Sequence, residues 1–166
     1  MAFKEISVKE LNENVTTLIG EEWMLVTAGD ENGHNMMTAS WGGIGVMWAK
    51  PVAVSVIRPQ RYTKKFLDKT DRFTLSFYGD DKEIHKICGS KSGSDTDKTA
   101  ETGLAPVYSD GTVYFEQARL VLVCKKLYVQ PMDENCFIDK SLMKFYEEKD
   151  FHVMYVGEIE KVLVKE

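Results

Sequence analysis

Short runs in which apolar and polar residues alternate recur along most of this chain, and they predict β-strands. Residues 23–28 form an apolar run, and the Gly, Asp and Asn residues at 29–33 are typical of a turn, so we expect a hairpin with residues 35–41. Glycines at 42, 43 and 45 predict a second turn before residues 51–58, which alternate cleanly. Further strands are expected at 72–78, within 112–130 and at 152–164.

Segments with helical spacing are few and short. Pro59 ends the strand at 51–58, and residues 61–69 place Tyr62, Phe66 and Leu67 at helical spacing. Further short helices are expected at 80–87, from about Asp95, and at 141–148. Strands outnumber helices, and no strand–helix alternation or internal repeat is present in the sequence. The pattern therefore predicts a mainly β fold, an antiparallel barrel with short peripheral helices, and the length suits a single domain over residues 1–166.

Charge and hydropathy exclude several classes of partner. The chain has 26 acidic and 21 basic residues, a net charge of −5, which disfavours generic binding to nucleic-acid phosphates. Its apolar runs fall far short of the roughly 20 residues that span a bilayer, and the N-terminus lacks the apolar region of a signal peptide. We therefore expect a cytoplasmic protein that binds neither nucleic acid nor membrane, and in which any anion site is local.

The cysteines do not predict a disulfide framework or a metal centre. Cys88, Cys124 and Cys136 are odd in number, widely spaced, and lack a paired zinc-ligand spacing. His85 and Cys88 lie three residues apart on an expected helix, but two ligands do not make a site. We expect reduced, separate thiols and no metal, with His85 at the surface and Cys88 packed in the interior.

Basic residues gather around Pro59. Arg58 and Arg61 bracket a strand-to-helix turn, and Thr63 and Lys64 follow in the first helical turn, where free backbone amides favour a phosphate. Arg61, Thr63 and Lys64 are therefore candidates to hold a dianion. The alternative is that Thr63 only caps the helix and that the charged residues are solvated, and this segment alone leaves both readings open.

A second candidate is the hydroxyl-rich segment 87–98. It lacks the second glycine and the Lys–Ser pair of a nucleotide-triphosphate loop, and the glycines at 42–45 lack the spacing of a dinucleotide fold. What remains is a loop that could carry Ser90, Ser92 and Lys98 to an anion. The aromatic residues Trp41, Trp48 and Tyr62 lie near the glycines and the basic turn, where a ring could stack, although such residues are more often core or interface.

Four segments taken together resemble a known family. They are Asn35-x-x-Thr-Ala-Ser-Trp41, Ile57-Arg-Pro-Gln-Arg-Tyr-Thr63, Cys88-Gly-Ser-x-Ser-Gly-x-Asp-x-Asp-Lys98 and His152-x-Met-Tyr-x-Gly-Glu-Ile159. In this order they resemble the flavin reductase-like family of FMN-binding split barrels, close to flavoredoxins. The resemblance implies a Greek-key split β-barrel with FMN rather than FAD, in a homodimer with the cofactor near the subunit interface.

The resemblance also implies which residues meet the cofactor. A polar strand end would meet the flavin and its phosphate chain, and the basic turn and loop would hold the phosphate at Arg61, Thr63 and Lys98. The expected cofactor-binding set is Asn35, Thr38, Ala39, Ser40, Trp41, Arg58, Arg61, Tyr62, Thr63, Ser90 and Lys98.

Two positions depart from similar sequences. Position 94 is serine where arginine is common, which removes one cation that would meet a phosphate or a nicotinamide nucleotide. Position 38 is threonine where some flavoredoxin-like chains carry cysteine, so a thiol role at the flavin edge is not supported. Redox chemistry then rests on the flavin, and no catalytic residue is assigned.

Three functions follow from the resemblance, in decreasing order of support. The first is an FMN-dependent oxidoreductase that takes hydride from NAD(P)H and passes electrons to an acceptor. The second is a flavoredoxin-type electron carrier that a partner protein reduces instead. The third, a flavin-free binding module, is opposed by the retained residues Asn35, Thr38, Trp41, Thr63 and Lys98.

Overall fold

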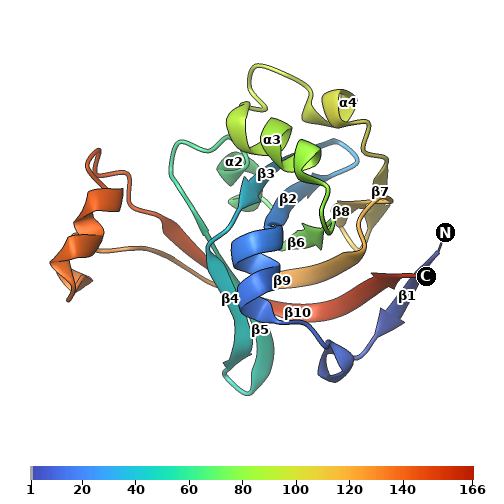
Figure 1. Ribbon diagram of the computed structural model, residues 1–166, viewed down its shortest axis with the longest axis horizontal. Coiled ribbons are helices and arrows are strands. Elements are labelled where there is room, and N and C mark those ends of the chain that lie inside the picture. Colours follow the sequence, from blue (N-terminus) through green and yellow to red (C-terminus); the bar gives the residue numbers. More distant parts are fainter. Residues whose placement is uncertain (1) are drawn as a thin grey trace.

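The computed structural model describes residues 2–166, and most of its regular structure is β-strand (Figure 1). The strands are β1 (Phe3–Ile6), β2 (Met24–Asp30), β3 (Gly33–Ala39), β4 (Gly42–Met47), β5 (Lys50–Ile57), β6 (Arg72–Phe77), β7 (Pro106–Ser109), β8 (Thr112–Phe115), β9 (Leu120–Pro131) and β10 (Val153–Lys165). The helices are short: α1 (Val15–Thr17), α2 (Lys64–Leu67), α3 (Lys82–Ser90) and α4 (Lys98–Thr102), with 3₁₀ turns η1 (Val8–Glu10), η3 (Glu134–Cys136) and η4 (Lys140–Phe145) and a π-helical turn η2 (Leu18–Glu22).

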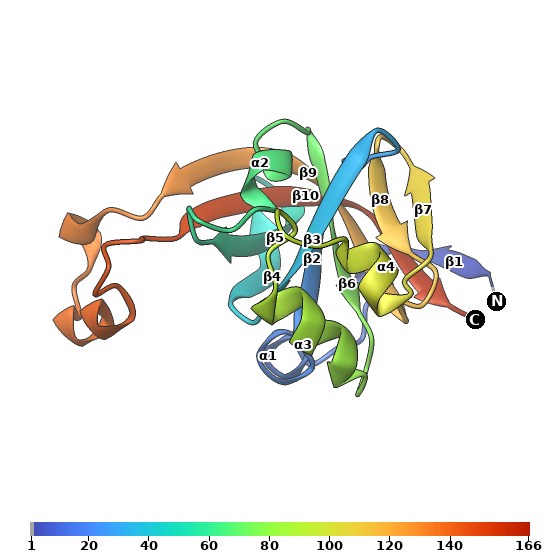
Figure 2. The ribbon, with the colours of Figure 1, turned by 90° about the horizontal axis from the view of Figure 1, so that it is seen from above.

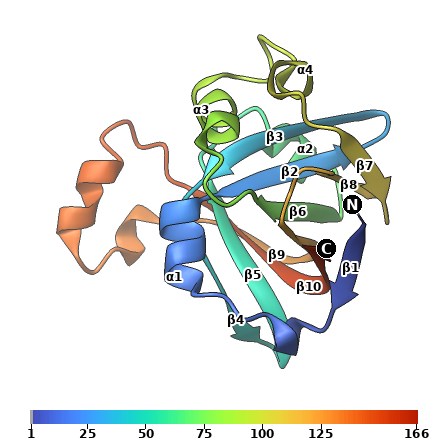
Figure 3. The same cartoon turned by 45° about the vertical axis from the view of Figure 1, so that its right-hand side comes forward.

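One antiparallel sheet organises the domain. Its strand order is β3-β2-β6-β9-β10-β5-β4, with β1 added on β10, while β7 and β8 form a separate hairpin. The two ends of this order, β3 and β4, are joined in the chain only by Ser40 and Trp41. So short a link requires the sheet to curl until its ends approach each other, as Figure 3 shows. The expected mainly β antiparallel fold of the split-barrel type is confirmed.

The sheet is buried on both faces where β6 and β9 pair. Along β9, Leu120, Leu122 and Cys124 point into one apolar cluster, and Val121 and Val123 point into the other. This alternation follows from the two-residue period of a strand. Helix α3 packs against β3, the strand at one end of the sheet order (Figure 3). One face of β3 is therefore covered by this helix.

The hairpin expected after residue 23 is confirmed as β2 and β3, with Glu31 and Asn32 as its turn. The prediction of a glycine-rich turn at 42–45 is wrong, since these residues form β4, and the turn lies at Trp48 and Ala49, whose φ angles are 52° and 57°. A tertiary contact explains the glycine at 42: a Cβ there would lie 2.2 Å from the Val54 carbonyl oxygen. Only glycine permits that approach of the two strands.

The helix expected at 80–87 is found as α3 (Lys82–Ser90), but the other helices are shorter than expected or displaced. Residues 61–69 contain only the single turn α2, because the Thr70 hydroxyl bonds to the carbonyl oxygens of Phe66 (3.0 Å) and Arg72 (2.9 Å) and leads the chain directly into β6. The helix expected from Asp95 begins at Lys98, with Asp97 as its N-cap. The helix expected at 141–148 is the 3₁₀ turn η4.

Residues 132–151, here called the arm, project away from the sheet between β9 and β10 (Figure 2). Arg58 fastens the arm to β5: it pairs with Asp150 at 2.7 Å, and its guanidinium donates to the Phe145 carbonyl oxygen at 3.0 Å. The base of the arm therefore lies against the end of β5.

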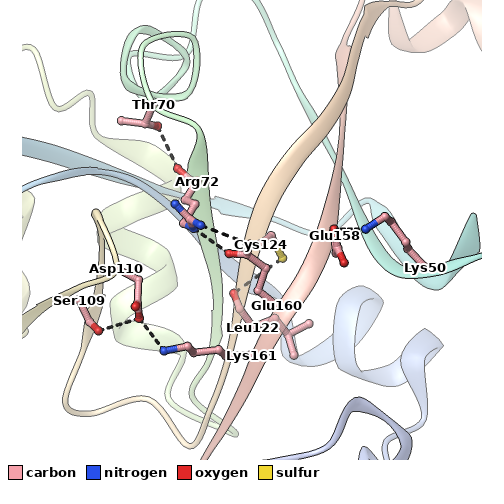
Figure 4. A network of polar contacts seen from close by, with 10 residues as sticks. All are labelled: Lys50, Thr70, Arg72, Ser109, Asp110, Leu122, Cys124, Glu158, Glu160 and Lys161. Atoms are coloured by element: carbon pink, nitrogen blue, oxygen red, sulfur yellow. Dashed lines mark hydrogen bonds and ion pairs between the residues drawn. The ribbon is translucent and has the colours of Figure 1, made fainter. Parts of the chain in front are cut away.

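Ion pairs fasten β10 to the structure around it on another part of the sheet (Figure 4). Arg72 meets Glu160 at 2.7 Å, Lys161 meets Asp110 at 2.9 Å and Lys50 meets Glu158 at 2.8 Å. Each pair is partly exposed and contributes about 0–1 kcal/mol. Among residues 2–166, no helix is both long and apolar enough to cross a bilayer.

Candidate functional site

Two neighbouring pockets lie around the end of β3. The strand-end pocket, about 280 Å³, is lined by residues 37–41, Val56, Arg58, Arg61 and His152. The loop pocket, about 130 Å³, is lined by residues 60–63, residues 90–92 and Lys98. Arg61 lines both, so the two pockets meet at its side chain.

Two cations, one buried and one partly buried, converge on the last turn of α3 beside the loop pocket. Lys98 is only 3% exposed, and its Nζ donates to the carbonyl oxygens of Met36 (2.9 Å) and Cys88 (3.0 Å). Arg61 donates to the carbonyl oxygens of Cys88 (3.2 Å) and Gly89 (3.1 Å). The end of a helix exposes unpaired carbonyls and attracts cations, which explains both contacts.

The charge of these cations is not neutralised by a carboxylate. Within residues 2–166, neither Arg61 nor Lys98 forms an ion pair, and burial lowers the pKa of Lys98 to about 8. Burial lowers the pKa of Arg61 as well. Two uncompensated, partly desolvated positive charges make this corner suitable for an anion.

Asn35 and Thr63 join β3 to the start of α2. Asn35 Nδ2 donates to Thr63 Oγ1 at 2.8 Å, and both side chains are buried. Thr63 makes no capping bond to α2, so it is not a simple N-cap. Because α2 has only four residues, its N-terminus is a minor contribution to an anion site, and the Arg61 and Lys98 side chains carry the charge.

Gly93 brings the loop 91–97 against Asn35. A Cβ at position 93 would lie 2.1 Å from Asn35 Oδ1, which is closer than real Cβ contacts. Only glycine therefore lets the loop backbone lie on this buried amide. Asn35, Tyr62 and Lys98 also line a larger, open hollow of about 690 Å³ between the β2–β3 turn and residues 93–99.

Thr38 connects the strand-end pocket to α3. Its hydroxyl lies 2.9 Å from His85 Nδ1 and 3.2 Å from the His85 carbonyl oxygen. His85 is buried, with Trp23 and Tyr78 packed edge-on against its ring. Burial, followed by the nearby Lys82, lowers the pKa of His85 to about 4, so the imidazole is neutral at pH 7.

Side chains of the arm pack against Trp41, Arg58 and His152, which line the strand-end pocket. The centre of the Trp41 ring lies 5.2 Å from the centre of the Phe145 ring and 5.1 Å from the centre of the His152 ring. Tyr146 Oη lies 2.7 Å from His152 Nδ1, and the Arg58 guanidinium lies 5.2 Å from the centre of the Tyr146 ring. Burial, followed by Arg58, lowers the pKa of His152 to about 4. A neutral imidazole therefore faces this pocket.

The structure brings most of the sequence-derived candidates together around the two pockets. Thr38, Ala39, Ser40, Trp41, Arg58 and Arg61 line the strand-end pocket, and Arg61, Tyr62, Thr63, Ser90 and Lys98 line the loop pocket. Three residues considered from the sequence line neither pocket. Asn35 lines the larger hollow and bonds to Thr63, Lys64 pairs with Asp68 at 2.6 Å, and Trp48 packs on Tyr128 at the β4–β5 turn.

Sequence reasoning missed the two histidines of the site. His152 stands at the start of the motif at 152–159 and lines the pocket, but no pattern in that motif marked it as a lining residue. The expectation that His85 lies at the surface is wrong, since it is 2% exposed. Its role in holding Thr38 depends on β3 and α3 packing together, which local sequence does not report.

Comparison with known proteins gives a consistent result. The model of the flavin reductase like domain matches residues 18–166. A search of curated proteins returned no match.

Solved structures give the same fold at low sequence identity. An FMN-binding protein from Thermus thermophilus superposes with a TM-score of 0.64 and 22% identity, covering 94% of this chain and 73% of that one. Flavoredoxin of Desulfovibrio vulgaris gives 0.69 and 21%, covering 97% and 78%. An NADH:FAD oxidoreductase of Streptomyces globisporus gives 0.66 and 14%, covering 87% and 75%.

Proposed function

This chain belongs to the flavin reductase-like family, and from that premise we propose that it binds FMN and acts as an oxidoreductase, passing hydride from NAD(P)H to the flavin and electrons onward to an acceptor. The observation that carries the proposal is the convergence of the partly buried Arg61 and the buried Lys98, neither neutralised by a carboxylate, beside a pocket lined by Thr38 and Trp41. A flavin mononucleotide combines these two requirements, an apolar ring with polar edges and a terminal phosphate.

The donor set fits a phosphate. Lys98 uses two of its three N–H groups on carbonyl oxygens, so one remains for a ligand. The Thr63 hydroxyl accepts from Asn35 and keeps its own proton for donation. Charge-assisted hydrogen bonds contribute about 1.5–3 kcal/mol each, and a micromolar site needs about 8 kcal/mol, so a few such contacts and ring burial suffice.

The strand-end pocket is the proposed ring site. Bound FMN would supply the redox chemistry, as is general for flavin cofactors. The protein would contribute Thr38 as a polar contact, Trp41 as an aromatic wall and Arg61 at the junction with the phosphate. Asn35, Ala39, Ser40, Arg58, Tyr62 and Ser90 remain proposed members of the binding set. Of these, Ser90 is already bonded to the Lys86 carbonyl oxygen at 2.5 Å.

An electron carrier reduced by a partner protein is the second candidate. Likeness to a flavoredoxin favours it, and likeness to an NADH:FAD oxidoreductase favours direct use of a nicotinamide. Both likenesses are at low identity, so the choice between them rests on experiment.

The deciding experiment is an anaerobic titration of the FMN-loaded protein with NADH and with NADPH, followed by flavin absorbance. Bleaching by either nucleotide supports the oxidoreductase. A flavin that stays oxidised with both, but bleaches when a reduced protein donor is added, supports the carrier. A purified protein that is colourless and does not quench added FMN fluorescence contradicts both.

We also propose that the chain forms a homodimer, as the family resemblance implies. Apolar side chains exposed at the β4–β5 turn and on the arm support this, including Val46 (78% exposed), Trp48 (55%) and Ile138 (96%). Light scattering coupled to size exclusion should give twice the chain mass of 18.9 kDa. A cytoplasmic location likewise stays a prediction.

A further inference from the structure

The hydroxyl of Thr38 has an unusual set of partners, since both belong to one residue. His85 Nδ1 lies 2.9 Å away and the His85 carbonyl oxygen 3.2 Å away, and His85 belongs to α3, the helix that lies beside β3 in Figure 3. Thr38 also lines the strand-end pocket. The hydroxyl therefore lies between a fixed protein environment and the place where a ligand would bind.

The hydroxyl proton has an acceptor on the protein side in either neutral tautomer of His85. When the imidazole proton is on Nε2, Nδ1 is a lone pair at 2.9 Å and accepts from Thr38. When the proton is on Nδ1, that group donates to Thr38, and the main-chain oxygen at 3.2 Å accepts the hydroxyl proton. Either arrangement occupies the hydroxyl proton and leaves a lone pair of Thr38 Oγ1 free to accept from a ligand in the pocket that Thr38 lines.

The surroundings of His85 hold this arrangement in place. Its ring is 2% exposed, it packs edge-on against Trp23 and Tyr78, and Nε2 has no hydrogen-bond partner among residues 2–166. Thr38 is therefore the one polar side chain that the His85 ring contacts by a hydrogen bond within those residues. Gly89 brings α3 close to the strand, since a Cβ there would lie 3.4 Å from Thr38 Cβ.

From this geometry we infer that His85 is a positioning residue that makes Thr38 a hydrogen-bond acceptor toward the strand-end pocket, so that the pocket selects a ring presenting an N–H at that point. The inference rests on the proposed function, because it takes the flavin ring to be the occupant. A flavin offers this chemistry from two sources: the imide N–H at N3, present in both redox states, and the N–H that N5 gains on reduction. A carbonyl oxygen of the ring would be disfavoured there.

The test compares FMN with N3-methyl FMN, which lacks the imide N–H, in wild type, Thr38→Val and Thr38→Ser. Affinities come from quenching of flavin fluorescence, and the reduction potential of bound FMN is measured alongside. If Thr38 accepts from the imide, Thr38→Val weakens FMN binding about 3- to 10-fold but does not change binding of N3-methyl FMN. Thr38→Ser keeps wild-type discrimination between the two ligands.

If Thr38 accepts from the N–H gained on reduction, the affinity for oxidised FMN is unchanged in Thr38→Val, and the reduction potential of bound FMN falls. Either result supports an acceptor at position 38. Equal weakening of FMN and N3-methyl FMN with an unchanged potential overturns the inference, and so does no effect on affinity or potential. Wild-type protein that binds no FMN removes the proposed function as well, which separates the two failures.

His85→Phe tests the positioning role, since it keeps an aromatic side chain and removes Nδ1. The main-chain oxygen of residue 85, 3.2 Å from the Thr38 hydroxyl, remains in this variant. We expect discrimination in favour of the N–H ligand, or the potential difference, to shrink toward that of Thr38→Val, because the hydroxyl loses its 2.9 Å contact to Nδ1 and keeps only the longer one. Unchanged discrimination would mean that the main-chain oxygen alone holds the proton, and it would contradict the positioning role of the ring. A purely packing role for His85 would lower thermal stability and weaken both ligands equally, leaving the ratio of their affinities unchanged. That outcome contradicts the positioning role.

Discussion

The two halves of the candidate site are built in different ways. At the loop pocket, Lys98 is almost fully buried and bonds to carbonyl oxygens of β3 and α3, so the fold itself uses the cation. At the strand-end pocket, Trp41 is 41% exposed and its nearest aromatic neighbours come from the arm and its base. One half is part of the core, and the other is formed where the arm meets the sheet.

Under the proposed function, the loop pocket would bind the phosphate and the strand-end pocket would hold the reactive ring. A charge held by internal carbonyls is placed before any ligand arrives, so little ordering is required on binding. The cost is that the loop pocket cannot change without disturbing α3, α4 and β3. The strand-end pocket can change its partly exposed aromatic wall at smaller cost in stability.

The largest effect should come from Lys98→Met. Loss of a charge-assisted hydrogen bond should weaken FMN binding about 10- to 100-fold, and two buried carbonyl oxygens lose a donor, lowering the free energy of unfolding by about 1–3 kcal/mol. Fluorescence quenching and urea denaturation measure the two quantities. Lys86→Met, on the exposed side of α3 and paired with Glu83, is the control and should change neither appreciably.

Lys98→Arg keeps the charge and should recover part of the affinity. If Lys98→Met folds and binds FMN as wild type does, the loop pocket is not the phosphate site. The difference in burial between the two pockets would then have no bearing on FMN binding.

The pH dependence of binding sharpens the same contrast. Burial lowers the pKa of Lys98 from 10.5 to about 8, so the free protein loses this charge as the pH rises through 8. FMN affinity should fall above that pH, by up to about tenfold per unit. Stability of the free protein moves the other way: between pH 8 and 10.5 the unfolded chain holds more protons, so this group's contribution to the free energy of unfolding rises with pH.

Titrating FMN at intervals from pH 7 to 9.5 measures the effect, and Lys98→Met should remove the fall above pH 8. The histidines His85 and His152, whose pKa values are lowered to about 4, do not titrate in this range. A fall that persists in Lys98→Met would assign it to another group.

Strand positions were readable from sequence because alternation reports a strand's two faces, as in β5 and β6. The strand β4 was not, since its glycines carry the local signal of a turn, whereas Gly42 is required by its close approach to Val54 on the neighbouring strand. Local preference was overruled by a contact between strands.

The site was readable to the extent that its motifs are contiguous. The basic turn and the hydroxyl-rich loop each carry a local signal, but burial of Lys98 depends on Met36 and Cys88, which lie 62 and 10 residues away. The Thr38–His85 contact spans 47 residues. Such pairings follow from how β3, α3 and α4 pack, which no single segment specifies.

Gly93→Ala tests whether residues 91–97 contribute to the loop pocket. The new Cβ would meet Asn35 Oδ1 at 2.1 Å, so the loop must move away from β3. We expect the free energy of unfolding to fall by about 1–3 kcal/mol, as for overpacked sites, and FMN binding to weaken by a smaller factor than in Lys98→Met. Gly43→Ala, with no atom within 4 Å of the added Cβ, is the matched control. Wild-type affinity in both variants would place the loop outside the site.

The smallest effect should come from freeing the arm with Asp150→Asn. This change removes the ion pair with Arg58, whose side chains are 27% and 21% exposed, and should cost about 0.5–1 kcal/mol. Because Arg58 also holds Phe145 and Tyr146, hydrogen exchange should quicken across residues 132–151, with FMN affinity within about threefold of wild type. Glu134→Gln breaks the Lys149 pair inside the arm and should leave exchange at its base unchanged. A larger loss of FMN affinity in Asp150→Asn than in Lys98→Met would reverse the comparison and make the arm the principal binding element.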